Sequence, residues 1–219
     1  MPTAPHFRPA VLDAREALRA GRQRLRSMHD GGADGFRVSA DLTDLIDSIL
    51  LGLYAEACSQ ATVADIEEEI ALVAHGGYGR RDMAPFSDVD LMLLIAPGWD
   101  VQVQPVARRL TQDICDMGLT LGFSLRAPSE ACSLAIADAT VFTSLAESRF
   151  LAGNRKRFDL FLDRLRRRGR HRLRTLIASI EHSRMEERGK YGETNTESQL
   201  GTLPGAGDLR STVQALALP

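Results

Sequence analysis

Two short apolar runs constrain the fold of this 219-residue chain more than any other feature. IALVAH occupies residues 70–75 and VDLMLLI occupies residues 89–95, with turn residues at their ends. Runs of this length without polar alternation are typical of strands that are buried on both faces of a sheet. The segment between them, GGYGRRDMAPFSD, is rich in Gly and Pro, so we expect it to form an irregular connection.

Helical patterns flank these two runs. Six apolar residues fall on one face of a helix that Asp41 can cap, namely Leu42, Leu45, Ile46, Ile49, Leu50 and Leu53. Further helices are expected at residues 9–28, at 103–117 and through most of the chain after residue 129, and a third strand is expected at 119–126. The sequence therefore predicts an α/β (α+β) fold, with a small mixed sheet flanked by helices and a helical C-terminal part.

The overall composition excludes several classes of protein. The formal net charge of −2 gives the whole chain no attraction to nucleic acid or anionic lipid. Cys58, Cys115 and Cys132 are widely spaced and contain no CxxC pair, so neither a disulfide framework nor a structural zinc site is indicated. No stretch approaches the roughly 20 apolar residues that a membrane-spanning helix needs. We expect a cytoplasmic protein that is neither secreted nor inserted in a membrane.

Two carboxylates stand together at the start of the second predicted strand. Asp88 and Asp90 are two residues apart, and the period-2 geometry of a strand directs both side chains to the same side. Neighbouring carboxylates repel each other unless a cation lies between them, and Mg²⁺ uses oxygen ligands of this kind where substrate phosphates also bind it. We therefore expect Asp88 and Asp90 to be catalytic residues that bind a metal.

A glycine turn directly follows the first predicted strand. Gly76 and Gly77 lack Cβ atoms, so their backbone can approach a triphosphate and offer N–H groups to its oxygens. Arg80 and Arg81 add positive charge nearby, and Ser87 could cap the turn or contact phosphate. A phosphate cradle and a metal pair in one unit are what an in-line displacement at phosphorus requires.

The segment GGYGRRDMAPFSDVDLMLL, residues 76–94, resembles the nucleotidyltransferase signature of the bacterial PII uridylyltransferase/uridylyl-removing enzymes, within the DNA polymerase β superfamily. The flanking segments DLTDLIDSILLGLYAEA, GLTLGFSLRAPSEA and DATVFTSLAESRFLAG and the late KYGETN and LPGAGDLRS extend the similarity over most of residues 40–210. The resemblance implies a polymerase β-like nucleotidyltransferase fold. It divides the chain into an N-terminal helical extension (1–40), a nucleotidyltransferase core (41–127), a helical region (128–190) and a linker or truncated start of a following helical domain (191–219).

The same resemblance implies transfer of UMP from UTP to a tyrosine of the PII signal protein, with Mg²⁺ or Mn²⁺ as cofactor. Carried over by position, Gly76 and Gly77 would line the triphosphate, and Asp88 and Asp90 would bind the metals. The family's uridylyl-removing and glutamine-sensing domains are not matched in this sequence, so removal and regulation are not implied. Two other hypotheses stay open: adenylylation of a protein from ATP, because the motif does not identify the base, and a nucleotide-binding domain that signals without catalysis.

The sequence departs from the family pattern at three points. Arg-Asp at 81–82 stands where the family usually has Gly-Glu, Phe123 stands where it often has His, and the late motif lacks the usual spacing. These departures bear on the substrate more than on the nucleotidyl chemistry. Separately, the predicted third strand, Leu119–Arg126, lacks the acidic residue that the superfamily generally places there, and the nearest acids are Asp116 and Glu130. This absence predicts loose metal binding.

Two further features receive a structural interpretation. The run RLRRRGRHRLR, residues 164–174, carries seven arginines, but Gly169 interrupts it and no aromatic residue interleaves. We interpret it as a solvated helix face or a contact for an acidic partner, and we do not expect nucleic acid to bind. His75, at the end of the first predicted strand, is expected to be a packed residue and not a catalytic base.

Overall fold

The computed structural model describes residues 7–191 and confirms a mixed α/β fold. The four strands are β1 (Ile70–Ala74), β2 (Val89–Ile95), β3 (Leu121–Arg126) and β4 (Arg149–Gly153). The helices are α1 (Pro9–Asp30), α2 (Gly35–Ser59), α3 (Gly76–Arg80), α4 (Asp100–Asp116), α5 (Pro128–Ala137), α6 (Ala139–Ala146), α7 (Arg155–His171) and α8 (Leu173–Tyr191), with a short 3₁₀ helix, η1 (Ile66–Glu69), before β1.

The four strands form one mixed sheet in the order β3-β2-β1-β4. β1 pairs antiparallel with both β2 and β4, whereas β2 pairs in parallel with β3. The three runs predicted as strands therefore share one sheet, as the site hypothesis requires. The parallel pair is connected through α4, which provides the crossover that parallel strands need.

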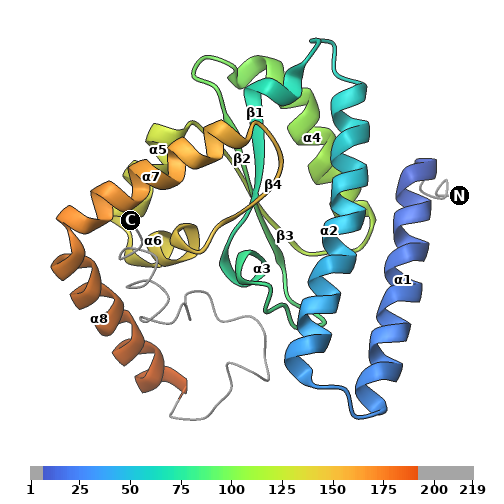
Figure 1. The fold of residues 1–219 in the computed structure, drawn as a ribbon, viewed down its shortest axis with the longest axis horizontal. Coiled ribbons are helices and arrows are strands. Elements are labelled where there is room, and N and C mark those ends of the chain that lie inside the picture. The colour runs from blue at the N-terminus through green and yellow to red at the C-terminus, as the bar shows by residue number, and fades with distance from the viewer. Residues whose placement is uncertain (1–6, 192–219) are drawn as a thin grey trace, which may run out of the picture.

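Helices cover both faces of the sheet, which explains why the strand sequences are apolar without alternation. Leu72, Leu91 and Leu93 pack with α1, α2 and α4 in one core, while Val73 and Met92 pack with α5, α6, α7 and α8 in the other. Figure 1 shows the sheet between these two groups of helices. The residues of β1, and those of β2 other than Asp90, are therefore buried whichever way they point, whereas those of the outer strands β3 and β4 stay partly exposed.

β4 was not predicted: it is a strand within residues 128–190, which we expected to be a mainly helical region. RFLAG is only half-buried and follows helical sequence, so it lacks the long apolar run that identified the other strands. Its strand conformation depends on pairing with β1, with an irregularity in register between Leu72 and Val73. Gly153 ends the strand at φ 86°, a backbone conformation that favours glycine. Pairing with β1, which lies far away in the sequence, therefore determines the strand conformation of this segment.

One helix boundary and one short helix also differ from the prediction. α2 begins at Gly35, where the Asp34 side chain accepts from the Arg37 N–H, so Asp41 lies inside the helix and does not cap it. α2 therefore crosses position 40, where the N-terminal extension was predicted to end. The division of the chain into four segments stays a prediction. Its last segment falls mostly on residues 192–219, which lie outside the described residues. The Gly-rich connection contains a helix, α3, where an irregular segment was expected. Helices at 9–30 and 100–116 confirm the other two helix predictions.

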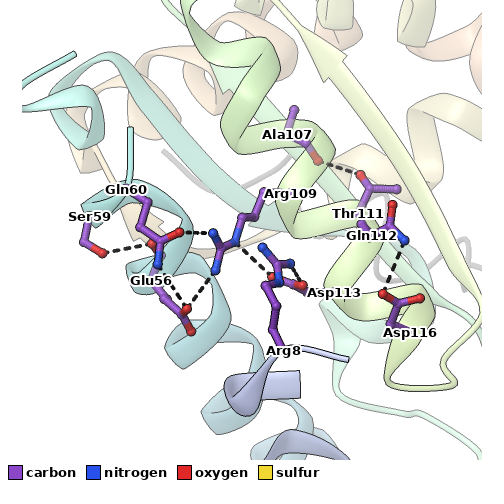
Figure 2. Close-up of polar contacts among 10 residues, drawn as sticks. All are labelled: Arg8, Glu56, Ser59, Gln60, Ala107, Arg109, Thr111, Gln112, Asp113 and Asp116. Carbon is purple, nitrogen blue, oxygen red and sulfur yellow. Dashed lines mark hydrogen bonds and ion pairs between the residues drawn. The ribbon is translucent and has the colours of Figure 1, made fainter. Parts of the chain in front are cut away.

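A buried carboxylate joins α1, α2 and α4 on the face opposite α5–α8. Asp113 of α4 is 1% exposed and forms ion pairs with Arg8, just before α1, and with Arg109, at 3.5 Å. Arg109 also pairs with Glu56 of α2 at 2.7 Å. Figure 2 shows these side chains converging, with Asp116 nearby on α4. A buried charge needs such partners, so the cluster fixes how the N-terminal helix docks.

The arginine-rich run lies at the end of α7 and the start of α8. Leu165 and Gly169 are buried, whereas Arg164, Arg167 and Arg168 are exposed. Gly169 continues the helix, and the break comes at Arg172. This placement is that of a solvated basic face beside a buried leucine stripe.

None of the helices within residues 7–191 has the length and apolar character needed to cross a membrane.

Gly153→Ala should destabilise the fold by roughly 1–3 kcal/mol, because an alanine there adopts an unfavourable positive φ and its Cβ overlaps the Ile70 carbonyl oxygen. Gly52→Ala is the matched control. Gly52 lies inside α2 with open space around it, so alanine should raise stability by up to about 1 kcal/mol through helix propensity. Urea unfolding of both variants measures this, and equal stability would contradict the role of Gly153.

Candidate functional site

Asp88 and Asp90 lie at the N-terminal end of β2, beside the start of β3. Asp90 is the second residue of β2, and it lies on the sheet face that Met92 and Leu94 direct toward α5–α8. Asp88 precedes the strand by one residue and has the same parity. Burial and, after it, the nearby charge of Asp88 raise the pKa of the Asp90 carboxyl.

The Asp90 carboxylate lies between two glycines from different elements. Gly76 has a φ of 59°, and a Cβ added there would stand 2.6 Å from Asp90 Oδ2. Gly122 of β3 pairs with Asp90 in register, and a Cβ added there would overlap Asp90 Oδ1. With the Asp90 side chain in this position neither side leaves room for a Cβ, and the positive φ of Gly76 independently favours glycine there. This slot brings the glycine turn and the acidic strand together, as the spacing of the motif predicted.

The two carboxyl groups of Asp88 and Asp90 form an environment that suits a cation. Burial raises the pKa of the Asp90 carboxyl to about 6, the Asp88 charge raises it in the same direction, and Arg80 lowers it. A cation beside the pair would favour the ionised carboxylates, so this donor set fits a divalent metal with oxygen ligands. Within residues 7–191 no group of three or more His, Cys, Asp or Glu side chains is arranged to hold a metal ion.

The two acids nearest to β3 in the sequence have other roles. Asp116 lies near the end of α4, where the Gln112 amide donates to it at 3.3 Å (Figure 2). Glu130 accepts from the Ala127 N–H at the start of α5, which lies beyond the opposite end of β3 from Gly122. The position on β3 beside Asp90 is Gly122, and the Asp90 carboxylate occupies the space that a side chain there would take.

The short helix α3 is held by a charged cluster that the sequence did not reveal. Arg149 of β4 forms a two-bond pair with Asp47 of α2, at 2.6 and 3.1 Å. The Tyr78 hydroxyl donates to the same carboxylate at 2.6 Å. Arg149 also donates to the carbonyls of Tyr78 and Gly79 at the end of α3, at 3.3 and 3.4 Å. One arginine thus ties the glycine turn to α2 and β4.

The remaining residues predicted for the site have protein partners. Arg80 pairs with Asp82 at 2.8 Å and with Glu147 at 2.7 Å. Arg81, at φ 67°, pairs with the exposed Asp44 at 2.6 Å. The assignment of Arg80 to the triphosphate stays a prediction, as does that of Gly77, whose carbonyl accepts from the Asp82 N–H and closes the turn.

Ser87 takes part in the turn before Asp88. Its hydroxyl accepts from the Ala84 N–H at 3.0 Å, and its own N–H donates to the Ala84 carbonyl at 3.0 Å. This is the capping geometry that serine commonly adopts in turns. Phe123, which stands where the family often has His, pairs with Leu91 and packs in the core on the opposite face from Asp90. That departure therefore changes the core on the α2 and α4 side of the sheet.

His75 connects the glycine turn to α6. Its Nδ1 atom lies 2.8 Å from Ser144 Oγ, and its main-chain N–H donates to the Asp90 carbonyl at 3.1 Å. Burial lowers the pKa of His75 to about 4, against a hydrogen bond to the Leu91 carbonyl and the Asp88 charge, which both raise it. The ring is therefore neutral near pH 7. This agrees with a packed histidine.

Sequence reasoning missed Asp47, Gly122, Ser144 and Arg149 as parts of the site. A charged residue beside the apolar face of α2 was an available signal for Asp47, because buried charges are paired. The other three are brought to the site by pairing and packing between segments that are distant in the sequence.

Comparison with known proteins supports the resemblance. The chain is 36% identical over 166 residues to the bifunctional uridylyltransferase/uridylyl-removing enzyme of Aromatoleum aromaticum, a match that covers 76% of this chain and 18% of that protein. It is 34% identical over 170 residues to the enzyme of the same name from Azospirillum brasilense, with the same two shares. The chain is homologous to a segment of these enzymes. No family model matches it.

The homologous segment is a small part of each relative. The match to the enzyme from Erythrobacter litoralis, 34% identical over 157 residues, covers 69% of this chain and 17% of that protein. The chain thus spans less than a fifth of the length of these relatives. What it shares with them is the portion that contains the glycine turn, the two carboxylates and their supporting sheet.

Asp47→Asn should lower stability by roughly 1–3 kcal/mol, because it leaves the half-buried Arg149 without its counter-ion. Asp44→Asn provides a matched control on the same helix. Asp44 and Arg81 are both exposed, so loss of this pair should cost less than about 1 kcal/mol. Thermal and urea unfolding compare the two variants. Equal losses would show that the Asp47 cluster does not hold α3.

Proposed function

We propose that this chain is a metal-dependent nucleotidyltransferase that transfers UMP from UTP to a tyrosine of a PII signal protein. The observation that carries the proposal is the Asp90 carboxylate lying between Gly76 and Gly122, with Asp88 at its side. This arrangement places a metal-binding pair against a backbone with no side chain, which suits a triphosphate. The relatives support the choice of nucleotide, since their name describes uridylyl transfer.

The chain's own residues would take distinct roles. Asp88 and Asp90 would hold Mg²⁺ or Mn²⁺, and either ion when bound would neutralise negative charge on the triphosphate and the departing pyrophosphate. Gly76 and Gly77 would let the main chain approach the phosphates closely. Arg80, which already influences the Asp90 carboxyl, would contribute positive charge, and Ser87 would hold the turn that leads into Asp88.

The reaction balances without any further reactant. The tyrosine oxygen attacks the α-phosphorus of UTP and forms a new phosphorus–oxygen bond. The bond from that phosphorus to the oxygen bridging to the β-phosphorus breaks, pyrophosphate leaves with the electron pair, and the phenolic proton passes to water. The proposal covers transfer alone and attributes no uridylyl removal to this chain.

Asp88→Asn and Asp90→Asn should each leave the protein folded and reduce transfer by orders of magnitude, because each removes a metal ligand and leaves the apolar core intact. For Asp90 the change also removes a half-buried negative charge that lies close to the charge of Asp88. Asp163→Asn, an exposed carboxylate on α7, is the control and should retain native transfer. The assay incubates the chain with each α-labelled NTP, Mg²⁺ or Mn²⁺ and a PII protein, and measures label on the protein.

The assay separates the competing hypotheses. Label from UTP alone supports the proposal, whereas label from ATP on a different acceptor would replace it with protein adenylylation. Nucleotide binding without any transfer would favour a signalling domain. Native transfer in either folded Asp variant would refute the site assignment.

Mg²⁺ should bind weakly to the chain alone and more tightly in the presence of a non-hydrolysable UTP analogue, because two carboxylates leave most positions around the ion to phosphate and water. Isothermal titration calorimetry with and without the analogue measures the difference. Tight binding without nucleotide that is abolished by Asp116→Asn or Glu130→Gln would show that a third carboxylate had been overlooked.

A further inference from the structure

Ser144 brings a hydroxyl to the candidate site from a distant element. It lies on α6, which covers the same sheet face that carries Asp90, and α6 packs against α3. A Cβ added at Gly76 would stand 3.4 Å from Ser144 Oγ and 2.6 Å from Asp90 Oδ2. The hydroxyl and the carboxylate therefore border the same glycine. Nothing in the spacing of the motif predicted this contact, because Ser144 follows Asp90 by more than fifty residues.

His75 holds the Ser144 hydroxyl in place. The imidazole Nδ1 and Ser144 Oγ are hydrogen bonded at 2.8 Å, and the His75 main chain is bonded to the Asp90 carbonyl. His75 thus links the hydroxyl rigidly to the strand that carries the acidic pair. A serine hydroxyl has one donor and two acceptor positions, so one bond to His75 leaves it able to bind a second group.

The chemistry of the site selects the class of that second group. An uncharged hydroxyl next to a glycine backbone suits an oxygen-rich anion whose charge is already neutralised elsewhere, and a phosphate chain bound to a metal is such a group. Ser144 Oγ and Asp90 Oδ2 both border the space beside Gly76, so a phosphate chain held at the carboxylates by a metal would lie within reach of the hydroxyl.

We propose that Ser144 binds the triphosphate of the nucleotide beside Gly76, with His75 as the residue that positions its hydroxyl. This inference rests on the proposed function, and it adds a residue from α6 to a site that the motif confines to residues 76–90. It also gives α6 a part in the active site, in addition to its part in the core.

The test measures binding and not turnover. Ser144→Ala should fold with a modestly lower melting temperature, because the His75 ring loses its partner. It should lose about tenfold or more in affinity for a non-hydrolysable UTP analogue with Mg²⁺, as expected when one hydrogen bond to a charged group is removed. Its affinity for UMP should stay at the native value, because UMP lacks the β- and γ-phosphates. Ser133→Ala, an exposed serine on α5, is the control and should match the native chain for both ligands.

Each other outcome has a definite meaning. Native affinity of Ser144→Ala for the analogue would overturn the inference and leave the proposed function standing. An equal loss for UMP and the analogue would place the contact at the base, ribose or α-phosphate and would also overturn it. If the native chain binds neither ligand, the proposed function fails and the inference fails with it.

Discussion

The pairing of Arg149 with Asp47 is the interaction on which the candidate site depends. α3 is a single helical turn, far too short to be stable alone, and it begins at a glycine in a left-handed conformation. Its C-terminal carbonyls are satisfied by Arg149 and its tyrosine by Asp47, so β4 and α2 supply the free energy that the turn lacks. Without that support, the pairing of β1 with β2 and the bond from the His75 N–H to the Asp90 carbonyl would hold the start of the turn, but nothing comparable would hold its end.

The acidic pair, Asp88 and Asp90, also depends on its surroundings. Asp90 is half-buried between two glycines and beside another carboxylate, an arrangement that burial and like charge both disfavour in the absence of a cation. Strain of this kind is common where a protein keeps a group ready to bind a ligand. The superfamily generally places a third acidic residue on the neighbouring strand. Here Gly122 pairs with Asp90, and the Asp90 carboxylate occupies the space that a side chain at 122 would take.

The homologous enzymes share about three quarters of this chain at about one third identity, while the chain spans less than a fifth of their length. The relationship therefore concerns one structural unit: a mixed sheet, the turn between β1 and β2, and the helices that cover both faces. The departure at Phe123 belongs to the core of that unit, on the face away from Asp90. The departure at 81–82 lies at the turn itself, where Arg81 pairs with Asp44 and Asp82 with Arg80.

The sequence alone determined the three apolar strands, the main helices and the juxtaposition of the glycine turn with Asp88 and Asp90, because periodicity and local spacing decide these features. Only the tertiary structure decided β4, the helix within the Gly-rich segment, and the contributions of Asp47, Gly122, Ser144 and Arg149. Each of these depends on a partner that lies far away in the sequence: β1 for β4, Arg149 for α3, the parallel register for Gly122 and His75 for Ser144. Hydrogen bonding and packing between distant segments carry no local pattern, so they become visible only when the chain is folded.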